Sequence, residues 1–203
     1  MDNTKEEFSP ESSLRLIQNM IDRTRQGVFG NSRYFLLWGW CTFAAIIGQF
    51  LLKAVVHSEY HPVVWWIIVP CILISKYWSW KKEKAAAAKT YANEMMRYLW
   101  SALSLALFAI SLIFIKIGWE NCYPFYIVMY GIGTFVSGRV LQFKLFLWGG
   151  LISFVLAAAA IWFTFDYQAL FAAAAVFISY IVPGHLFRIQ NKRKDILLKG
   201  NII

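Results

Sequence analysis

The chain has 203 residues, of which 59% are hydrophobic and 15% are charged, and its formal net charge is +9. A soluble domain of this length would carry elements with one apolar and one polar face, whereas here the apolar residues run together in long blocks. Three cysteines are too few for a disulfide-rich secreted scaffold.

Residues 1–33 are polar and charged, and they predict a cytoplasmic N-terminal segment with an amphipathic helix rather than a cleavable signal peptide. Ser9 and Pro10 suit the N-cap and the first helical position. The surface that this helix offers to lipid or to a partner protein comprises Leu14, Ile17, Met20, Ile21, Arg23 and Arg25. The membrane surface is the favoured reading over a docking helix, because the bilayer always adjoins the segment.

Six apolar blocks of 19 to 23 residues follow, each long enough to cross a hydrocarbon core of about 30 Å as a helix. The predicted spans are residues 34–56, 62–80, 98–117, 123–141, 145–165 and 169–187. Helices are expected because an isolated strand would leave its backbone groups unpaired in lipid. The sequence therefore predicts an all-α membrane protein, a six-helix bundle over residues 34–187 arranged as three hairpins.

The lysines and arginines predict the orientation of these spans. Eighteen of the twenty fall on one side, and only Lys53 and Lys116 fall on the other. The positive-inside rule then places both termini in the cytoplasm, together with the basic tail 188–203 and the inner loop 81–97, which is predicted to be helical. The outer loops, residues 57–61, 118–122 and 166–168, are short.

The fourth span carries small residues at helical spacing: Gly131, Gly133, Thr134, Ser137 and Gly138. Such residues let two helix backbones approach closely in lipid. The favoured interpretation is packing within the chain, and the alternative is the contact face of a homo-oligomer.

Two spans contain a proline, which removes one backbone donor and kinks a helix. Kinks are expected at Pro70 and at Pro183, where Gly184 follows directly.

No catalytic, cofactor or metal signature is present in the sequence. His57, Glu59 and His61 have the residue types of a metal site, but Pro62 disfavours a helix there and a solvated turn is the favoured reading. The predicted spans hold no aspartate or glutamate, which makes an ion-coupled transporter less favoured.

The basic residues flank the spans, as topology and anionic lipids require, and no nucleic-acid reader motif accompanies them. Cys41 and Cys71 are expected to be small apolar fillers inside spans, and Cys122 a free thiol in an outer loop.

Three stretches carry a family resemblance: residues 36–40 (LLWGW), 134–138 (TFVSG) and 181–186 (IVPGHL). With the amphipathic start and the six spans, they resemble an uncharacterised family of small bacterial inner-membrane proteins. The resemblance implies a bacterial inner membrane, and it carries no activity and no functional residues.

The function expected from these observations is non-enzymatic. We expect a scaffold or regulatory partner whose cytoplasmic face binds a protein or anionic lipid, because most of the sequence outside the spans lies on that side. The alternative is a small transporter or channel for a neutral or lipid-like solute, which would use the kinked second and sixth spans.

Overall fold

The computed structural model describes residues 32–85 and 91–190. The predicted amphipathic helix with its lipid or partner surface, and the tail beyond residue 190, lie outside the described residues. The described part is all-helical, with no strand. Four of its helices are long and apolar enough to cross a membrane, namely Arg33–Val55, His61–Lys81, Glu94–Ile117 and Phe165–Gln190.

The helices follow the six apolar blocks of the sequence. They are α2 (Ser32–Phe50) with a π-helical turn (Leu51–Val55), a 3-10 segment (His61–Ile67) leading into α3 (Ile68–Ala85), α4 (Tyr91–Ile117), α5 (Cys122–Val140), α6 (Lys144–Ala160), and α7 (Phe165–Val176) with a second π-helical turn (Phe177–Ile181). Residues 182–190 continue the last helix. The expected helical character of the inner loop holds at residues 81–85 and 91–97, because α3 and α4 extend beyond their predicted spans.

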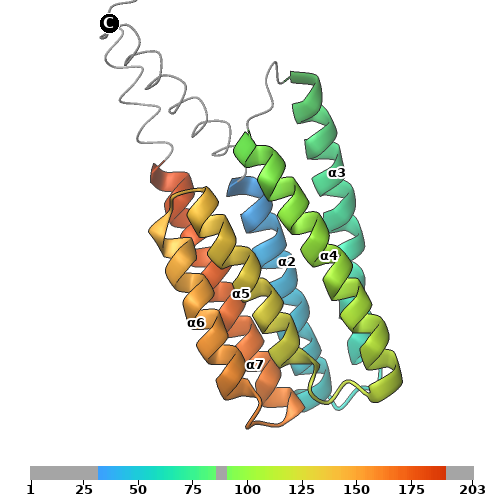
Figure 1. The fold of residues 1–203 in the computed structure, drawn as a ribbon. Helices are drawn as coiled ribbons and strands as arrows, with labels where there is room; N and C mark the ends of the chain where they lie inside the picture. The colour runs from blue at the N-terminus through green and yellow to red at the C-terminus, as the bar shows by residue number, and fades with distance from the viewer. Residues whose placement is uncertain (1–31, 86–90, 191–203) are drawn as a thin grey trace, which may run out of the picture.

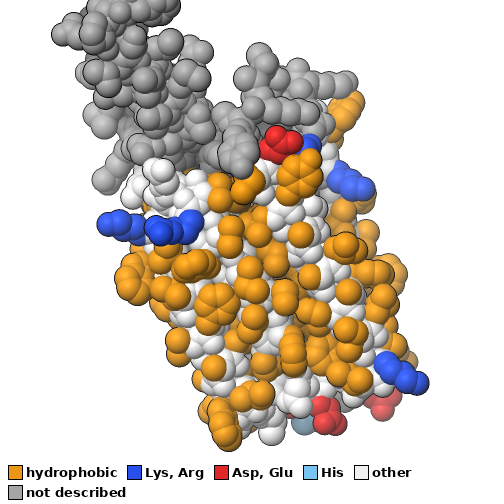
Figure 2. Space-filling view, in the orientation of Figure 1, with side chains coloured by type: hydrophobic (Ala, Val, Ile, Leu, Met, Phe, Trp, Pro, Cys, Tyr) orange, Lys and Arg blue, Asp and Glu red, His pale blue; other side chains and the backbone are white. Residues whose placement is uncertain are grey.

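Helices α2, α5, α6 and α7 form a bundle, and α3 and α4 lie along one side of it (Figure 1). α5 and α6 make the most extensive helix pair, α3 packs against α2, and α4 packs against α5. Apolar side chains cover the visible face of the helices, whereas most of the charged side chains lie near the two ends (Figure 2). Leu105 and Phe108 of α4, for example, are 70% and 63% exposed, as expected for side chains that face lipid.

Glycines bring the backbones of α5 and α6 into direct contact. A Cβ atom at Gly138 would lie 2.5 Å from the backbone nitrogen of Leu147, and one at Gly150 would lie 2.7 Å from that of Phe135. No side chain fits at these distances, so glycine is required at both positions. Close packing of this kind is what holds helices together where water does not drive their association.

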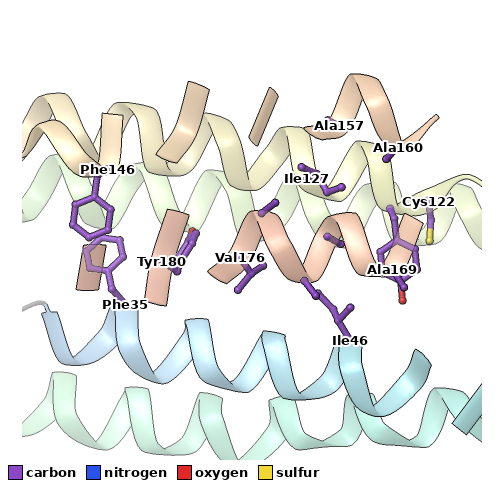
Figure 3. Close-up of a cluster of buried hydrophobic side chains, with 14 of the residues drawn as sticks. Phe35, Ile46, Cys122, Ile127, Phe146, Ala157, Ala160, Ala169, Val176 and Tyr180 are labelled. Atoms are coloured by element: carbon purple, nitrogen blue, oxygen red, sulfur yellow. The ribbon is translucent and has the colours of Figure 1, made fainter. Parts of the chain in front are cut away.

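Five aromatic rings from five helices meet in the core of the bundle. The ring of Phe35 lies 4.7 Å from that of Phe146 and 5.9 Å from that of Tyr180, centroid to centroid (Figure 3). Tyr180 also contacts Trp100 and Tyr130, at 5.8 and 5.5 Å. These rings join α2, α4, α5, α6 and the π-helical turn after α7. Where the core also contains buried alanines, such as Ala160 and Ala169, the helices can approach one another more closely.

The turn before α7 lies earlier in the chain than the predicted loop 166–168. The predicted span 145–165 ends as a helix at Ala160, residues 161–164 form the turn, and α7 begins at Phe165. Thr164 has the extended backbone of an N-cap residue, and Asp166 puts an acid in the first helical turn, where the helix dipole favours it. Asp166 and Gln168, predicted to be in a loop, therefore belong to the helix.

The cysteines also differ from expectation. Cys41 of α2 and Cys71 of α3 form a disulfide, with their Cα atoms 7.0 Å apart, instead of acting as separate fillers. Cys122 is a free thiol, as expected, but it is the buried first residue of α5 rather than a loop residue. The thirty-residue separation of the bonded pair gives no sequence signal, because the pairing depends on which faces of α2 and α3 meet.

The disulfide predicts how many cysteine thiols react with a maleimide before and after reduction. Protein unfolded in detergent under non-reducing conditions should add one maleimide-polyethylene glycol, at Cys122, and reduced protein should add three. Gel shifts measure the additions, and a Cys122→Ser variant should add none before reduction. Three additions without reductant would contradict the α2–α3 linkage.

The close α5–α6 contact predicts that adding one methyl group at Gly138 destabilises the protein. Gly138→Ala should lower the free energy of unfolding by about 1–3 kcal/mol, because the new Cβ meets backbone that cannot move aside. Gly48→Ala is the matched control, since its nearest neighbour is a methyl group of Val64 at 3.0 Å. Unfolding of the purified protein in mixed micelles measures both, and equal losses would contradict the special role of Gly138.

Candidate functional site

The densest polar network among the described residues lies at the end of the bundle that carries the turns 56–60, 118–121 and 161–164. Its centre is Gln49 of α2, which is 7% exposed. The Gln49 Oε1 atom accepts hydrogen bonds from Trp65 Nε1 and from the Tyr123 hydroxyl, the latter at 3.0 Å. The Gln49 Nε2 atom lies 3.4 Å from His61 Nδ1. One buried amide thus joins α2, the 3-10 segment and α5.

An ion pair joins the same end of α2 to α7. Lys53 lies in the π-helical turn Leu51–Val55, and its Nζ atom lies 3.1 Å from Asp166 Oδ1 and 3.8 Å from the ring centre of Phe165. Both charged side chains are more than one-third exposed. A pair this exposed contributes at most about 1 kcal/mol, so it fixes orientation more than stability.

Gln168 connects two of the outer turns to each other. This side chain is fully buried, and its Nε2 atom donates to Asn121 Oδ1 at 3.0 Å and to the Phe163 carbonyl at 2.9 Å. Its Oε1 atom has no hydrogen-bond partner among the described residues. The amide therefore ties the turn before α5 to the turn before α7.

The surroundings of this network lower the pKa of His61 below 6.5. Burial is the largest cause, and the positive charge of Lys53 adds to it, while Asp166 acts in the opposite direction. His61 is the first residue of the membrane-length helix His61–Lys81, so it lies at one end of the bundle. Burial also raises the pKa of Cys122 to about 12, so that this thiol stays protonated and unreactive near neutral pH.

Among the described residues, the arrangement does not bring together the ligands of a metal site. Within residues 32–85 and 91–190, no three His, Cys, Asp or Glu side chains lie close enough to hold a metal ion. His57 is exposed, with a backbone φ of 53°, whereas His61 turns toward Gln49. His57, Glu59 and His61 are thus not brought together as one ligand set. The network closes the end of the bundle by hydrogen bonds.

The structure divides the small residues of the fourth span among several contacts. Gly131 and Gly138 face α6, where their nearest neighbours are Phe154 and Leu147. Gly133 faces α4. Thr134 and Ser137 are fully buried, and their hydroxyl groups donate to carbonyls of their own helix. All five residues are buried within the chain.

Both prolines follow a change of helical geometry. The 3-10 segment ends at Ile67, three residues before Pro70, and the second π-helical turn ends at Ile181, two residues before Pro183. A proline has no backbone N–H group and cannot donate a hydrogen bond to the carbonyl four residues earlier. The tighter 3-10 turns before Pro70 and the wider π-helical turn before Pro183 accommodate this missing hydrogen bond. Gly184 packs against Leu36 of α2, where a Cβ atom would lie 3.0 Å from a leucine methyl.

A smaller polar set links α2 to its neighbours nearer the other end of the bundle. Trp38 Nε1 donates to Ser75 Oγ at 3.1 Å, and Trp40 Nε1 lies 3.4 Å from His185 Nε2. Each tryptophan bridges to a different helix, α3 or the last one. These contacts fix the position of α2 against the two neighbouring helices.

The sequence contained part of the signal for the outer network. Gln49 and His61 stand out as polar residues in or beside apolar blocks, but nothing in the spacing pairs them with Tyr123, which is 74 residues from Gln49. Asp166 and Gln168 were assigned to a loop rather than to α7, because the last turn was placed too late in the chain. Thr164 followed by Asp166 is a helix-start pattern that could have corrected it.

Comparison with protein-family models, with curated proteins and with solved structures finds no match to this chain.

Two tyrosines provide a matched test of the outer network. Tyr123→Phe removes a hydroxyl that donates to Gln49, and it should lower the free energy of unfolding by about 1–2 kcal/mol. Tyr180→Phe removes a buried hydroxyl with no partner among the described residues, and it should be neutral or stabilising. The measurement is unfolding in mixed micelles, and a larger loss for Tyr180→Phe would contradict this assignment.

Proposed function

We propose that the chain is a six-span protein of a bacterial inner membrane, with both termini in the cytoplasm. On this proposal it acts there as a non-enzymatic scaffold or regulatory partner through its cytoplasmic face. The lipid-facing apolar surfaces and the four long helices support membrane insertion. On this proposal α5 and α6 are the remaining two spans, which their packing along the same bundle and their short connection at residues 141–143 support.

The observation that carries the proposal is the unequal length of chain at the two ends of the bundle. α2 begins, α3 ends, α4 begins and the last helix ends at one end, where the segments 1–31, 86–90 and 191–203 attach (Figure 1). The turns at the other end have only four or five residues each. A protein partner thus has far more sequence to contact at the first end, which is also the basic end.

The basic residues support the assignment of that end to the cytoplasm. Among the described residues, Arg33, Arg97, Arg139, Lys144 and Arg188 lie at or near helix termini of this end. Lys53 and Lys116 lie toward the opposite end. By the positive-inside rule, the end of a membrane protein that is rich in lysine and arginine stays in the cytoplasm. The same positive charge favours contact with anionic lipid headgroups.

The aromatic core favours this proposal over the transporter alternative. Phe35, Phe146 and Tyr180 fill the space between α2, α6 and the last helix, and each is at most 5% exposed. A solute moving along the bundle axis would have to displace these rings. Asp166 is a carboxylate inside a helix, but it lies in the first turn and pairs with Lys53, rather than near the middle of the membrane.

Site-specific photo-crosslinking in living cells tests the proposal. A photoreactive amino acid at Met20 and at Ile189 should give the same adduct with one cytoplasmic protein, because both positions are predicted to lie on the cytoplasmic face; Ile189 is 51% exposed. Mass spectrometry identifies the adduct, and a photoreactive residue on the partner should crosslink back to this chain.

Two further positions serve as controls. Tyr60 is 81% exposed at the opposite end, and Leu105 is 70% exposed on α4. Neither should crosslink to the cytoplasmic partner. Adducts with lipid or a second copy alone at Met20 and Ile189 would contradict the scaffold role, and the same partner at Tyr60 would contradict the orientation.

A further inference from the structure

The hydrogen bonds of Gln49 fix the orientation of its amide. The indole nitrogen of Trp65 can only donate, so the group that faces it must be the Gln49 oxygen. The Tyr123 hydroxyl donates to the same oxygen. A flipped amide would place its NH2 group against the indole N–H. The Gln49 Nε2 atom must therefore face His61.

This orientation determines the protonation of His61. An amide nitrogen can only donate, so His61 Nδ1 must accept, and it can do so only without a proton. A neutral imidazole with its proton on Nε2 satisfies this requirement. An imidazolium carries protons on both nitrogens, and it would set two donors against each other across 3.4 Å.

The charged and titratable neighbours of His61 come from several elements. Lys53 of the π-helical turn disfavours a positive charge on His61, and Asp166 of α7 favours it but is itself paired with Lys53. On the α5 side, Tyr123 shares the Gln49 amide and Cys122 is a protonated thiol. His57, Glu59 and Tyr60 lie on the connection before His61.

Burial adds to these effects, and the folded pKa of His61 lies below 6.5. The contact with Gln49 is therefore fully present above that pH and weakens as the pH falls toward the lowered value.

None of the residues of the 3-10 segment His61–Ile67 is buried, although Trp65 packs against the core. Near its start, the segment contacts α2 through the hydrogen bonds of His61 and Trp65 to Gln49 and through the packing of Val64 against Gly48. The disulfide between Cys41 and Cys71 holds α3 further along, so a loss of the His61 hydrogen bond would loosen the start of the segment without detaching α3.

We propose that Gln49 and His61 form an acid-sensitive latch, in which protonation of His61 breaks its hydrogen bond with Gln49 and loosens the start of the segment His61–Ile67 on α2. The trigger is external acidity, which reaches His61 from the side opposite the basic end of the bundle. The latch goes beyond the scaffold role, and only the side from which acid reaches His61 rests on the proposed orientation.

The test measures exposure of the segment in the full-length protein. A Val64→Cys variant in nanodiscs is treated with a water-soluble maleimide, and modification of the peptide containing residue 64 is quantified by mass spectrometry. Rates are compared with those of the same protein carrying His61→Asn, which keeps an acceptor near Nδ1 and cannot titrate. The ratio of the two modification rates at each pH removes the effect of pH on the reactivity of the cysteine thiol, because both proteins carry the same cysteine.

Between about pH 7.5 and about pH 5, the rate ratio of the His61 protein to the His61→Asn protein should rise roughly three- to tenfold. A ratio that stays constant over this range would overturn the latch. His61→Gln is a second non-titrating reference, in case His61→Asn does not fold.

The other histidines provide the final control. The chain has three, so His57→Asn with His185→Asn leaves His61 as the only one. This protein should keep the full rise in the ratio. If the rise disappears, another histidine is responsible and the latch is overturned.

Discussion

Lipid gives neighbouring helices no hydrophobic reason to associate, so the bundle depends on how closely its backbones can approach. The contact between α5 and α6 meets that constraint through Gly138 and Gly150, which let each backbone pass within van der Waals reach of the other. Gly149 on the neighbouring face of α6 does the same toward Ser179 of the second π-helical turn. α6 is thereby fixed on two sides, and the aromatic residues of α2, α4 and α5 can pack around a rigid centre.

The two ends of this bundle are built by different physical means. At the end that carries the turns 56–60, 118–121 and 161–164, the turns are tied together by buried amides, because polar groups of Gln49 and Gln168 need partners where water is scarce. At the basic end, the described contacts are mainly aromatic side chains that bridge to a neighbouring helix, as with Trp38 and Ser75. The first end is thus closed by its own hydrogen bonds, whereas the longer connections of the chain leave the bundle at the basic end.

The sequence allowed the helices to be predicted because each apolar block must form its own backbone hydrogen bonds in lipid. The block boundaries were less predictable. Ile161, Trp162 and Phe163 are apolar and read as the end of a span, yet they form an exposed turn before Thr164 begins α7. The disulfide and the Gln49 network could not be predicted, because both depend on which helix faces meet across long separations. Gly131, Gly133 and Gly138 carry the spacing of a packing face, but spacing alone does not distinguish the α6 side from the α4 side.

The unequal lengths of the helices have a consequence for the surrounding bilayer. α6 has 17 residues and is about 25 Å long, whereas the part of α4 that forms the predicted span 98–117 is about 30 Å long. A hydrocarbon layer of about 30 Å is too thick for α6 and matches this part of α4. On the six-span proposal, lipid chains shorten or tilt beside α6 and keep their ordinary length beside α4, so that the membrane thickness differs between the two sides of the protein. Such a difference would draw the protein toward regions of the bilayer where thickness changes.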